Sequence, residues 1–85
     1  MPPVVVYTTP YCSYCGSAKA LLRRKGVEFT EISVAGAPDL RAEMVKRANG
    51  LTTVPQIFIG PDHVGGCDEL YELDGAGKLD SLLAG

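Results

Sequence analysis

Two cysteines separated by two residues, Cys12 and Cys15, are the feature of this sequence that most directly predicts chemistry. They lie between the apolar run Val4–Tyr7 and a segment of helical periodicity over residues 13–25. Residues three apart at the start of a helix share one face, so thiols placed there are close enough to bridge. The unpaired N–H groups of a helix N-terminus favour an anion, here the Cys12 thiolate. The pattern predicts a redox pair in which Cys12 is the nucleophile and Cys15 resolves the mixed disulfide.

The spacing of these cysteines has a second interpretation, because zinc sites use it as well. Cys12, Cys15, His63 and Cys67 are the residue types of a Cys₃His zinc set. Closing such a site would cover the reactive pair, and the strand-then-helix setting already accounts for both cysteines. Zinc therefore stays as the alternative to redox chemistry, with buried structural thiols as a further one.

Composition and charge favour one folded domain over residues 1–85 with no nucleic-acid or membrane partner. The formal net charge of −2 argues against nucleic acid, and the apolar runs are too short to span a bilayer. We find no charged start followed by an apolar stretch, as a secretory leader would have. Three cysteines are an odd number, which does not suit a closed disulfide framework. We therefore expect a soluble protein of a reducing, cytoplasmic setting.

The elements that must position the cysteines can be placed from periodicity and turn residues. The expected strands and helices are a strand over about residues 3–8, a helix over 13–25 closed by Gly26, a strand marked by Val27, Phe29 and Ile32, a helix from Pro38 to Asn49-Gly50, strands over 55–59 and 63–64, and short helical pieces over 68–73 and 78–83. The order β-α-β-α-β-β-α predicts an α/β sheet with helices on both faces. Its first two strands should be parallel and its last two a hairpin, which makes a four-stranded mixed sheet.

Three blocks of the sequence, in order, resemble the glutaredoxin family over nearly the whole chain. They are Tyr7–Cys15 (YTTPYCSYC), Thr52–Gly60 (TTVPQIFIG) and Gly65–Leu70 (GGCDEL). The resemblance implies a thioredoxin-like fold and glutathione-dependent reduction of protein disulfides and of mixed disulfides with glutathione. It also implies a monomer that takes glutathione and disulfide-containing or glutathionylated proteins as partners.

The resemblance further implies where glutathione binds beside the cysteines. In this fold a cis proline faces the active-site thiols, so the Val54–Pro55 bond is expected to be cis. The backbone of Val54, which follows Thr53, would then pair with the cysteinyl unit of glutathione as an added strand does. Tyr14, between the cysteines, would wall the site.

Gly66, Cys67 and Asp68 form the other expected contact with glutathione. A turn followed by a helix start is one interpretation of this segment. The functional interpretation is a free helix N-terminus whose N–H groups receive the γ-glutamyl carboxylate, while Asp68 accepts from the ammonium beside it. Cys67 would contribute its backbone N–H rather than its thiol.

Two departures from the family pattern stand close to Cys12. Many glutaredoxins carry a lysine where this chain has Thr9, and Arg41 is the candidate replacement as the cation for the glycine carboxylate. Ser13 stands where proline is commoner, which restores a backbone N–H near the Cys12 sulfur. Glutaredoxins with Ser-Tyr at this point include members that bind a 2Fe–2S cluster between two subunits. In those, the first cysteine, here Cys12, and glutathione supply the ligands, so a cluster-bridged homodimer is the alternative function.

Overall fold

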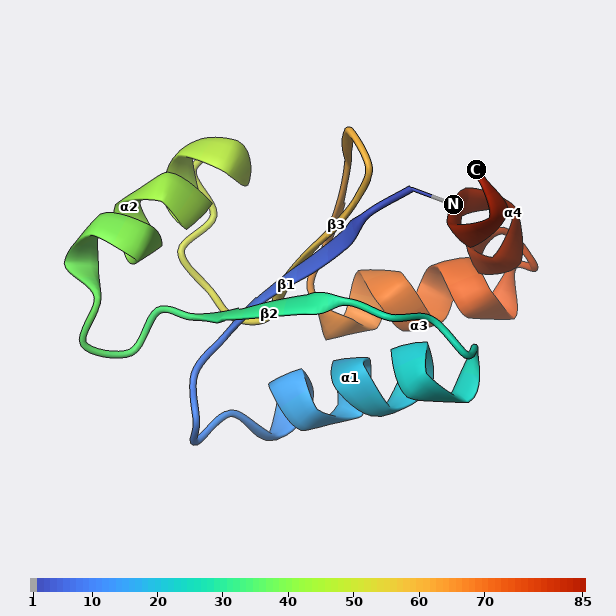
Figure 1. Cartoon of the computed structure of the whole chain (residues 1–85), viewed down its shortest axis with the longest axis horizontal. Helices are drawn as coiled ribbons and strands as arrows, with labels where there is room; N and C mark the ends of the chain where they lie inside the picture. Colours follow the sequence, from blue (N-terminus) through green and yellow to red (C-terminus); the bar gives the residue numbers. More distant parts are fainter. Residues whose placement is uncertain (1) are drawn as a thin grey trace.

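The computed structural model describes residues 2–85 and arranges them as a four-stranded sheet with helices on both faces (Figure 1). Its elements are β1 (Val4–Thr8), α1 (Ser13–Arg24), β2 (Thr30–Ser33), α2 (Pro38–Arg47), β3 (Gln56–Ile59), β4 (Asp62–Gly65), α3 (Cys67–Gly75) and α4 (Leu79–Ala84). The strand order is β2-β1-β3-β4, with β1 and β2 parallel and the other two pairs antiparallel. The predicted mixed sheet and thioredoxin-like α/β architecture are confirmed.

The two faces of the sheet follow from the two-residue period of a strand. Val4 and Val6 on β1 pack with α1, α3 and α4, whereas Tyr7 packs on the opposite face with Met44 of α2. On β3, Phe58 also belongs to the α2 face. Figure 1 shows α2 on one side of the sheet and α1 with α3 on the other. Helices therefore cover both faces of the sheet, and the loops that form the site lie at the ends of its strands.

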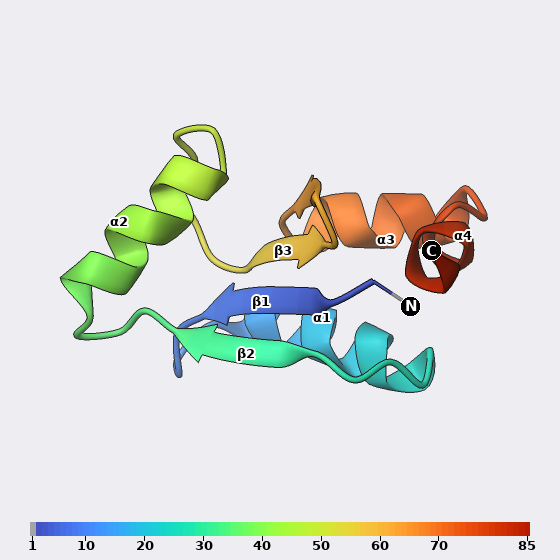
Figure 2. The same cartoon turned by 45° about the horizontal axis from the view of Figure 1, so that its top comes forward.

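The termini of α1 fix the direction in which the active-site loop enters the helix. Cys12 is the N-cap, with extended φ and ψ of −101° and 112°, and α1 ends before Gly26, whose φ is 71°. That left-handed conformation is one glycine adopts without a steric penalty, as predicted for the residue after the helix. Figure 2 shows β1, at whose end the active-site loop begins, running beside β2 in the same direction.

Two elements, β2 and α3, differ most from the sequence prediction. Val27 and Phe29 were expected to mark the second strand, but β2 covers only Thr30–Ser33. Both side chains instead pack on the α1 face of the core, because the turn after α1 already brings them there. The helix expected over 68–73 is longer, since α3 runs from Cys67 through Gly75. Across residues 2–85, none of the helices has the length and apolar character needed to cross a membrane.

Candidate active site

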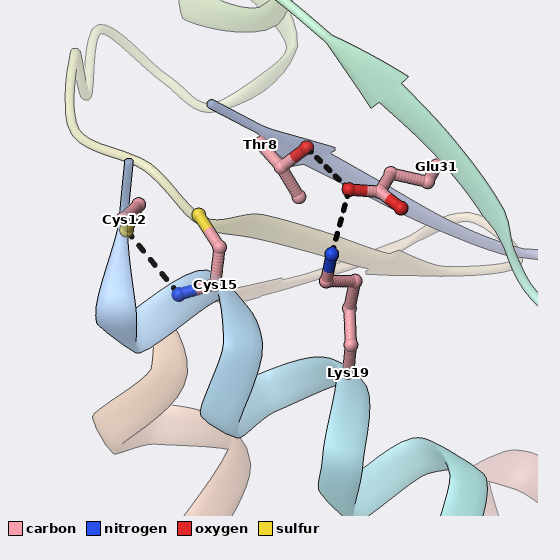
Figure 3. A network of polar contacts seen from close by, with 5 residues as sticks. All are labelled: Thr8, Cys12, Cys15, Lys19 and Glu31. Carbon is pink, nitrogen blue, oxygen red and sulfur yellow. Dashed lines mark hydrogen bonds and ion pairs between the residues drawn. The ribbon is translucent and has the colours of Figure 1, made fainter. Parts of the chain in front are cut away.

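Cys12 lies where the loop after β1 enters α1, and its sulfur has two polar neighbours. The backbone N–H of Cys15 donates to Cys12 Sγ at 3.2 Å (Figure 3). Cys12 Sγ donates to the carbonyl oxygen of Val54 at 3.6 Å, across 42 positions of sequence. The side chain of Cys12 is half-buried, so a substrate can reach its sulfur. A helix N-terminus that donates to this sulfur stabilises a thiolate, as a nucleophile requires.

Cys15 is in a different environment although it is only one turn further along α1. Its side chain is 1% exposed. Burial, followed by the hydrogen bond with Cys12, raises the pKa of Cys15 to about 11, while the Thr9 backbone and the Lys19 ammonium act in the opposite direction. Cys12, Cys15 and Cys67 are all free thiols in this structure. The pair therefore presents one accessible sulfur and one covered sulfur.

A groove of 330 Å³ begins beside Cys12 and brings together the residues predicted to bind glutathione, with one exception. Its lining is Tyr14, Thr53, Val54, Pro55, Gly66, Cys67, Asp68 and Glu69. The Val54–Pro55 peptide bond is cis, as the family resemblance implied. Tyr14 is 63% exposed, so its ring forms an open wall rather than part of the core. The groove joins the N-terminal region of α1 to that of α3 across the loop before β3.

The N-terminus of α3 forms the far side of this groove. Glu69 Oε1 accepts from the Gly66 N–H at 3.0 Å, which satisfies the N-cap residue. The next N–H groups, those of Cys67 and Asp68, have no partner within a helix and are available to an anion. Gly65 has a φ of 110°, which side chains other than glycine rarely adopt, and a Cβ there would also displace Glu69 Oε1, which would lie 2.8 Å away. This end of α3 is suited to a carboxylate.

The thiol of Cys67 is not a second reactive centre. Its side chain is 8% exposed, and burial, followed by the charge of Asp68, raises its pKa. A buried thiol that resists ionisation is a poor nucleophile. Cys67 therefore lines the groove with a thiol that resists ionisation, and the contact through its backbone N–H stays a prediction.

Three residues considered from the sequence lie outside the groove. Arg41, on α2, is half-buried and does not line it. Tyr11, which directly precedes Cys12, is 99% exposed and so is not part of the core. His63 stacks on Phe58 and pairs with Gln56 Oε1 at 2.8 Å. Within residues 2–85 no three His, Cys, Asp or Glu side chains gather as metal ligands, so the Cys₃His zinc arrangement is not formed.

Sequence reasoning missed two sets of residues near the site. Glu69 accepts from the Gly66 N–H, and the signal for it was a glutamate three residues after the N-cap, the half of a capping box that does not need an N-cap side chain. Thr8, Lys19 and Glu31 form a polar network beside Cys15 (Figure 3). The signal for Lys19 was its position four residues after Cys15, whereas nothing in the sequence placed Glu31 opposite it.

A larger cavity of 510 Å³ lies between β4, α3 and α4. Its lining includes Asp62, His63, Glu72 and Lys78, but no cysteine. Size alone would favour this cavity, yet thiol chemistry needs a sulfur within reach. The smaller groove beside Cys12 is therefore the candidate active site.

Comparison with known proteins agrees with this site. A family model described as Glutaredoxin matches residues 4–64. A protein named Glutaredoxin from Pseudomonas aeruginosa is 63% identical over 84 residues, which cover 99% of either chain. The solution structure of a glutaredoxin from Brucella melitensis has a TM-score of 0.86 and 61% identity, covering 98% of this chain and 89% of that one. The crystal structure of a buckwheat glutaredoxin–glutathione complex has a TM-score of 0.88 and 35% identity, covering 98% of this chain and 77% of that one.

Proposed function

Since the chain belongs to the glutaredoxin family and is a glutathione-dependent disulfide oxidoreductase, we propose that Cys12 is its nucleophile and Cys15 its resolving thiol. One observation carries this assignment above the others. Cys12 Sγ accepts from the first turn of α1 at 3.2 Å and lies 3.6 Å from the Val54 carbonyl at the mouth of the groove. A single sulfur is thus activated, accessible and adjacent to a peptide-sized groove.

The proposed reaction has two routes that share the first attack. Cys12 thiolate attacks a protein–glutathione mixed disulfide, takes the glutathionyl group and releases the protein thiol. A second glutathione then attacks the glutathionyl sulfur, which releases oxidised glutathione and restores the Cys12 thiolate. With a protein disulfide, Cys12 forms a mixed disulfide with the protein. Cys15 then attacks Cys12 Sγ, which closes the Cys12–Cys15 bridge and releases the reduced protein. The burial of Cys15 suits this intramolecular step, because a covered thiol cannot compete for outside substrates.

Glutathione is proposed to lie along the groove from Cys12 to the N-terminus of α3. The Val54 backbone pairs with the cysteinyl unit, as in strand addition. The γ-glutamyl carboxylate accepts from the N–H groups of Cys67 and Asp68, with Gly66 allowing close approach, and the Asp68 carboxylate accepts from the ammonium. A relative of similar fold is a glutaredoxin–glutathione complex, which supports this ligand class.

The glycine end of glutathione is proposed to point toward α2. Tyr14 and Thr53 line the groove at its Cys12 side. Thr9 offers no cation, so we assign the glycine carboxylate to Arg41 on α2. Because Arg41 does not line the groove, its side chain would have to extend toward the ligand, which makes this the outermost contact.

The test uses S-methylglutathione, which binds without reacting, and amide chemical shifts of ¹⁵N-labelled protein. We expect the shifts to concentrate on Val54, Cys67 and Asp68. The 510 Å³ cavity provides the internal comparison, because Asp62 and Lys78 line it and lie outside the groove. Shifts confined to that second cavity would contradict the proposed site, and so would undiminished binding after Asp68→Ala.

A second candidate function is a glutathione-ligated 2Fe–2S homodimer, to which each copy contributes Cys12. The observation that favours it is the exposure around this sulfur: Tyr11 is 99% and Tyr14 63% exposed, and Ser13 is exposed as well. Such a surface leaves room for a second copy. Thiolate sulfurs are the donors that iron–sulfur clusters use, so the residues present fit the group. When bound, a cluster would supply electron transfer or be passed on to a recipient protein.

Anaerobic reconstitution with iron, sulfide and glutathione tests the cluster. We expect a coloured dimer from the native chain and a colourless monomer from Cys12→Ser. A native chain that stays colourless and monomeric would leave the oxidoreductase function alone. Both functions need reduced thiols, which is why we also propose a cytoplasmic setting.

A further inference from the structure

Beside the two thiols lies a polar network that the proposed function does not use. Lys19 Nζ lies 2.9 Å from Glu31 Oε2, and Thr8 Oγ1 donates to the same oxygen at 2.8 Å. The three residues come from α1, β2 and β1, so the network ties the active-site helix to two parallel strands (Figure 3). Thr8 is 1% exposed and the Lys19 side chain 22%. The Glu31 side chain is 38% exposed, so water partly screens this ion pair, and the buried Thr8 hydroxyl anchors its carboxylate.

The network is adjacent to Cys15 through two connections. Lys19 follows Cys15 by four residues on α1, so their side chains share one face of the helix. Figure 3 shows both side chains extending from α1 toward the sheet. Thr8, held by Glu31, directly precedes Thr9, whose backbone interacts with the Cys15 thiol. Two groups favour a negative charge on the Cys15 sulfur: the Lys19 ammonium and the Thr9 backbone. Glu31 holds the first directly and the second through Thr8.

We propose that Lys19, held by Glu31 and Thr8, is a positioning residue that promotes the attack of Cys15 on the mixed disulfide at Cys12. The inference rests on the proposed function, since it takes Cys15 as the resolving thiol. In the step, the Cys15 thiol gives its proton to solvent, and its sulfur forms a bond with Cys12 Sγ. The bond between Cys12 and the client sulfur breaks, and the client leaves as a thiolate that takes up a proton. Lys19 acts by stabilising the Cys15 thiolate before it attacks.

Few charged groups other than Lys19 reach Cys15. Burial, followed by Cys12, raises the Cys15 pKa, and the influences that lower it are the Thr9 backbone and Lys19. From β2, Glu31 faces Lys19 and carries a lowered pKa because Lys19 and Thr8 bind it, with Arg23 adding a smaller effect. From α3, Asp68 and Glu69 act on Cys67. The loop before β3 brings no titratable side chain into the groove. Lys19 is therefore the cation whose removal should raise the pKa of Cys15.

The size of the effect follows from thiol reactivity. A cation within about 4–6 Å lowers a thiol pKa by about 1–3 units. Lys19 is the weakest of the influences on the Cys15 pKa and is partly neutralised by Glu31, so about one unit is the upper bound of its effect. If removing Lys19 raises the Cys15 pKa by about one unit, the thiolate population falls about tenfold. The more basic thiolate regains about threefold in nucleophilicity, since the Brønsted slope is about 0.4–0.5. Lys19→Met should therefore slow the Cys15 attack by up to about threefold.

The experiment separates the two attacks in one stopped-flow trace. Dithio-bis-nitrobenzoate reacts with Cys12 and releases one coloured thiolate; Cys15 then attacks Cys12 and releases the second. Cys15→Ser lacks the second phase and so identifies it. We expect Lys19→Met to slow the second phase by up to about threefold while the first keeps its rate. Lys19→Arg, which keeps the cation, should restore the second phase.

Lys25, the C-cap residue of α1, supplies the matched control. Its side chain is 23% exposed and pairs with Asp74 at 2.6 Å and Asp80 at 3.0 Å, near the C-terminal end of α1. Lys25→Met should therefore leave both phases unchanged. The proposal is overturned if Lys19→Met leaves the second phase unchanged, if Lys19→Arg fails to restore it, or if Lys25→Met slows it equally. Loss of the first phase in Cys12→Ser tests the proposed function separately, so the two failures are distinguishable.

Discussion

The two active-site thiols lie one helical turn apart and yet have opposite environments. Cys12 is half-buried, caps α1 and touches the groove through the Val54 carbonyl. Cys15 is 1% exposed, and burial together with the Cys12 hydrogen bond raises its pKa to about 11. Both residues are cysteines of the same Cys-x-x-Cys motif, so residue type and motif do not explain the difference. The position relative to the helix end and the covering side chains decide which sulfur meets the substrate.

The largest effect should come from replacing the two thiols one at a time. Cys12→Ser should abolish deglutathionylation and protein disulfide reduction alike, because both begin with its attack. Cys15→Ser should abolish only protein disulfide reduction, since a second glutathione can resolve the other intermediate. Parallel assays with a glutathionylated peptide and a protein disulfide measure the split. Equal loss of both activities in Cys15→Ser would remove the division of roles.

The pH dependence of bridge closure should show the raised pKa of Cys15. A thiol titrating above the working pH gains thiolate about tenfold per pH unit. In the mixed disulfide the hydrogen bond with Cys12 that raises the Cys15 pKa is lost, but burial still disfavours the Cys15 thiolate. The second colour-releasing phase should therefore accelerate from about pH 6 to about pH 9 without levelling. A rate that is flat across this range would mean that Cys15 is ionised in the intermediate.

Asp68→Ala should have a smaller effect, because Asp68 is remote from the reacting sulfurs. Losing an exposed charge-assisted hydrogen bond of about 1–1.4 kcal/mol should raise the KM for glutathione about 5- to 10-fold, with kcat nearly unchanged. Asp62→Ala removes the same charge from the lining of the second cavity and should leave KM alone. If the two variants raise KM equally, the effect is one of net charge and the γ-glutamyl contact is elsewhere.

Ser13→Pro should have the smallest effect on thiol chemistry and a selective one on the cluster. Ser13 is the first residue of α1, where the fixed φ of proline is tolerated and a missing N–H is not part of the helix ladder. The N–H that donates to Cys12 Sγ belongs to Cys15 and is retained. Oxidoreductase rates should stay within about twofold, whereas the yield of reconstituted dimer falls. Unchanged dimer yield would remove Ser13 from the cluster hypothesis.

The sequence predicted those parts of the molecule that depend on local chemistry. The N-cap position of Cys12, the turn at Gly26 and the free N-terminus before Cys67 each follow from residues adjacent in sequence. The mixed sheet followed from element order and connection length. The position of Val54 against Cys12 came from the family resemblance and not from local pattern.

The parts that the sequence did not predict depend on long-range register. Glu31 meets Thr8 and Lys19 only because β2 pairs in parallel with β1, with Thr8 opposite Ser33 and Val6 opposite Glu31. A shift of one residue would turn Glu31 to the other face of the sheet. The second strand also began later than its apolar residues indicated, so its register was beyond sequence reasoning.

The most direct test of the account is brief alkylation of the reduced native protein with iodoacetamide, followed by fragmentation mass spectrometry that locates the label. Cys12 should carry the label while Cys15 and Cys67 remain free, because only Cys12 has an accessible sulfur that a helix N-terminus activates. Labelling of all three cysteines in protein unfolded with guanidinium provides the control. A label found first on Cys15 or Cys67 would contradict the assignment of Cys12 as the nucleophile.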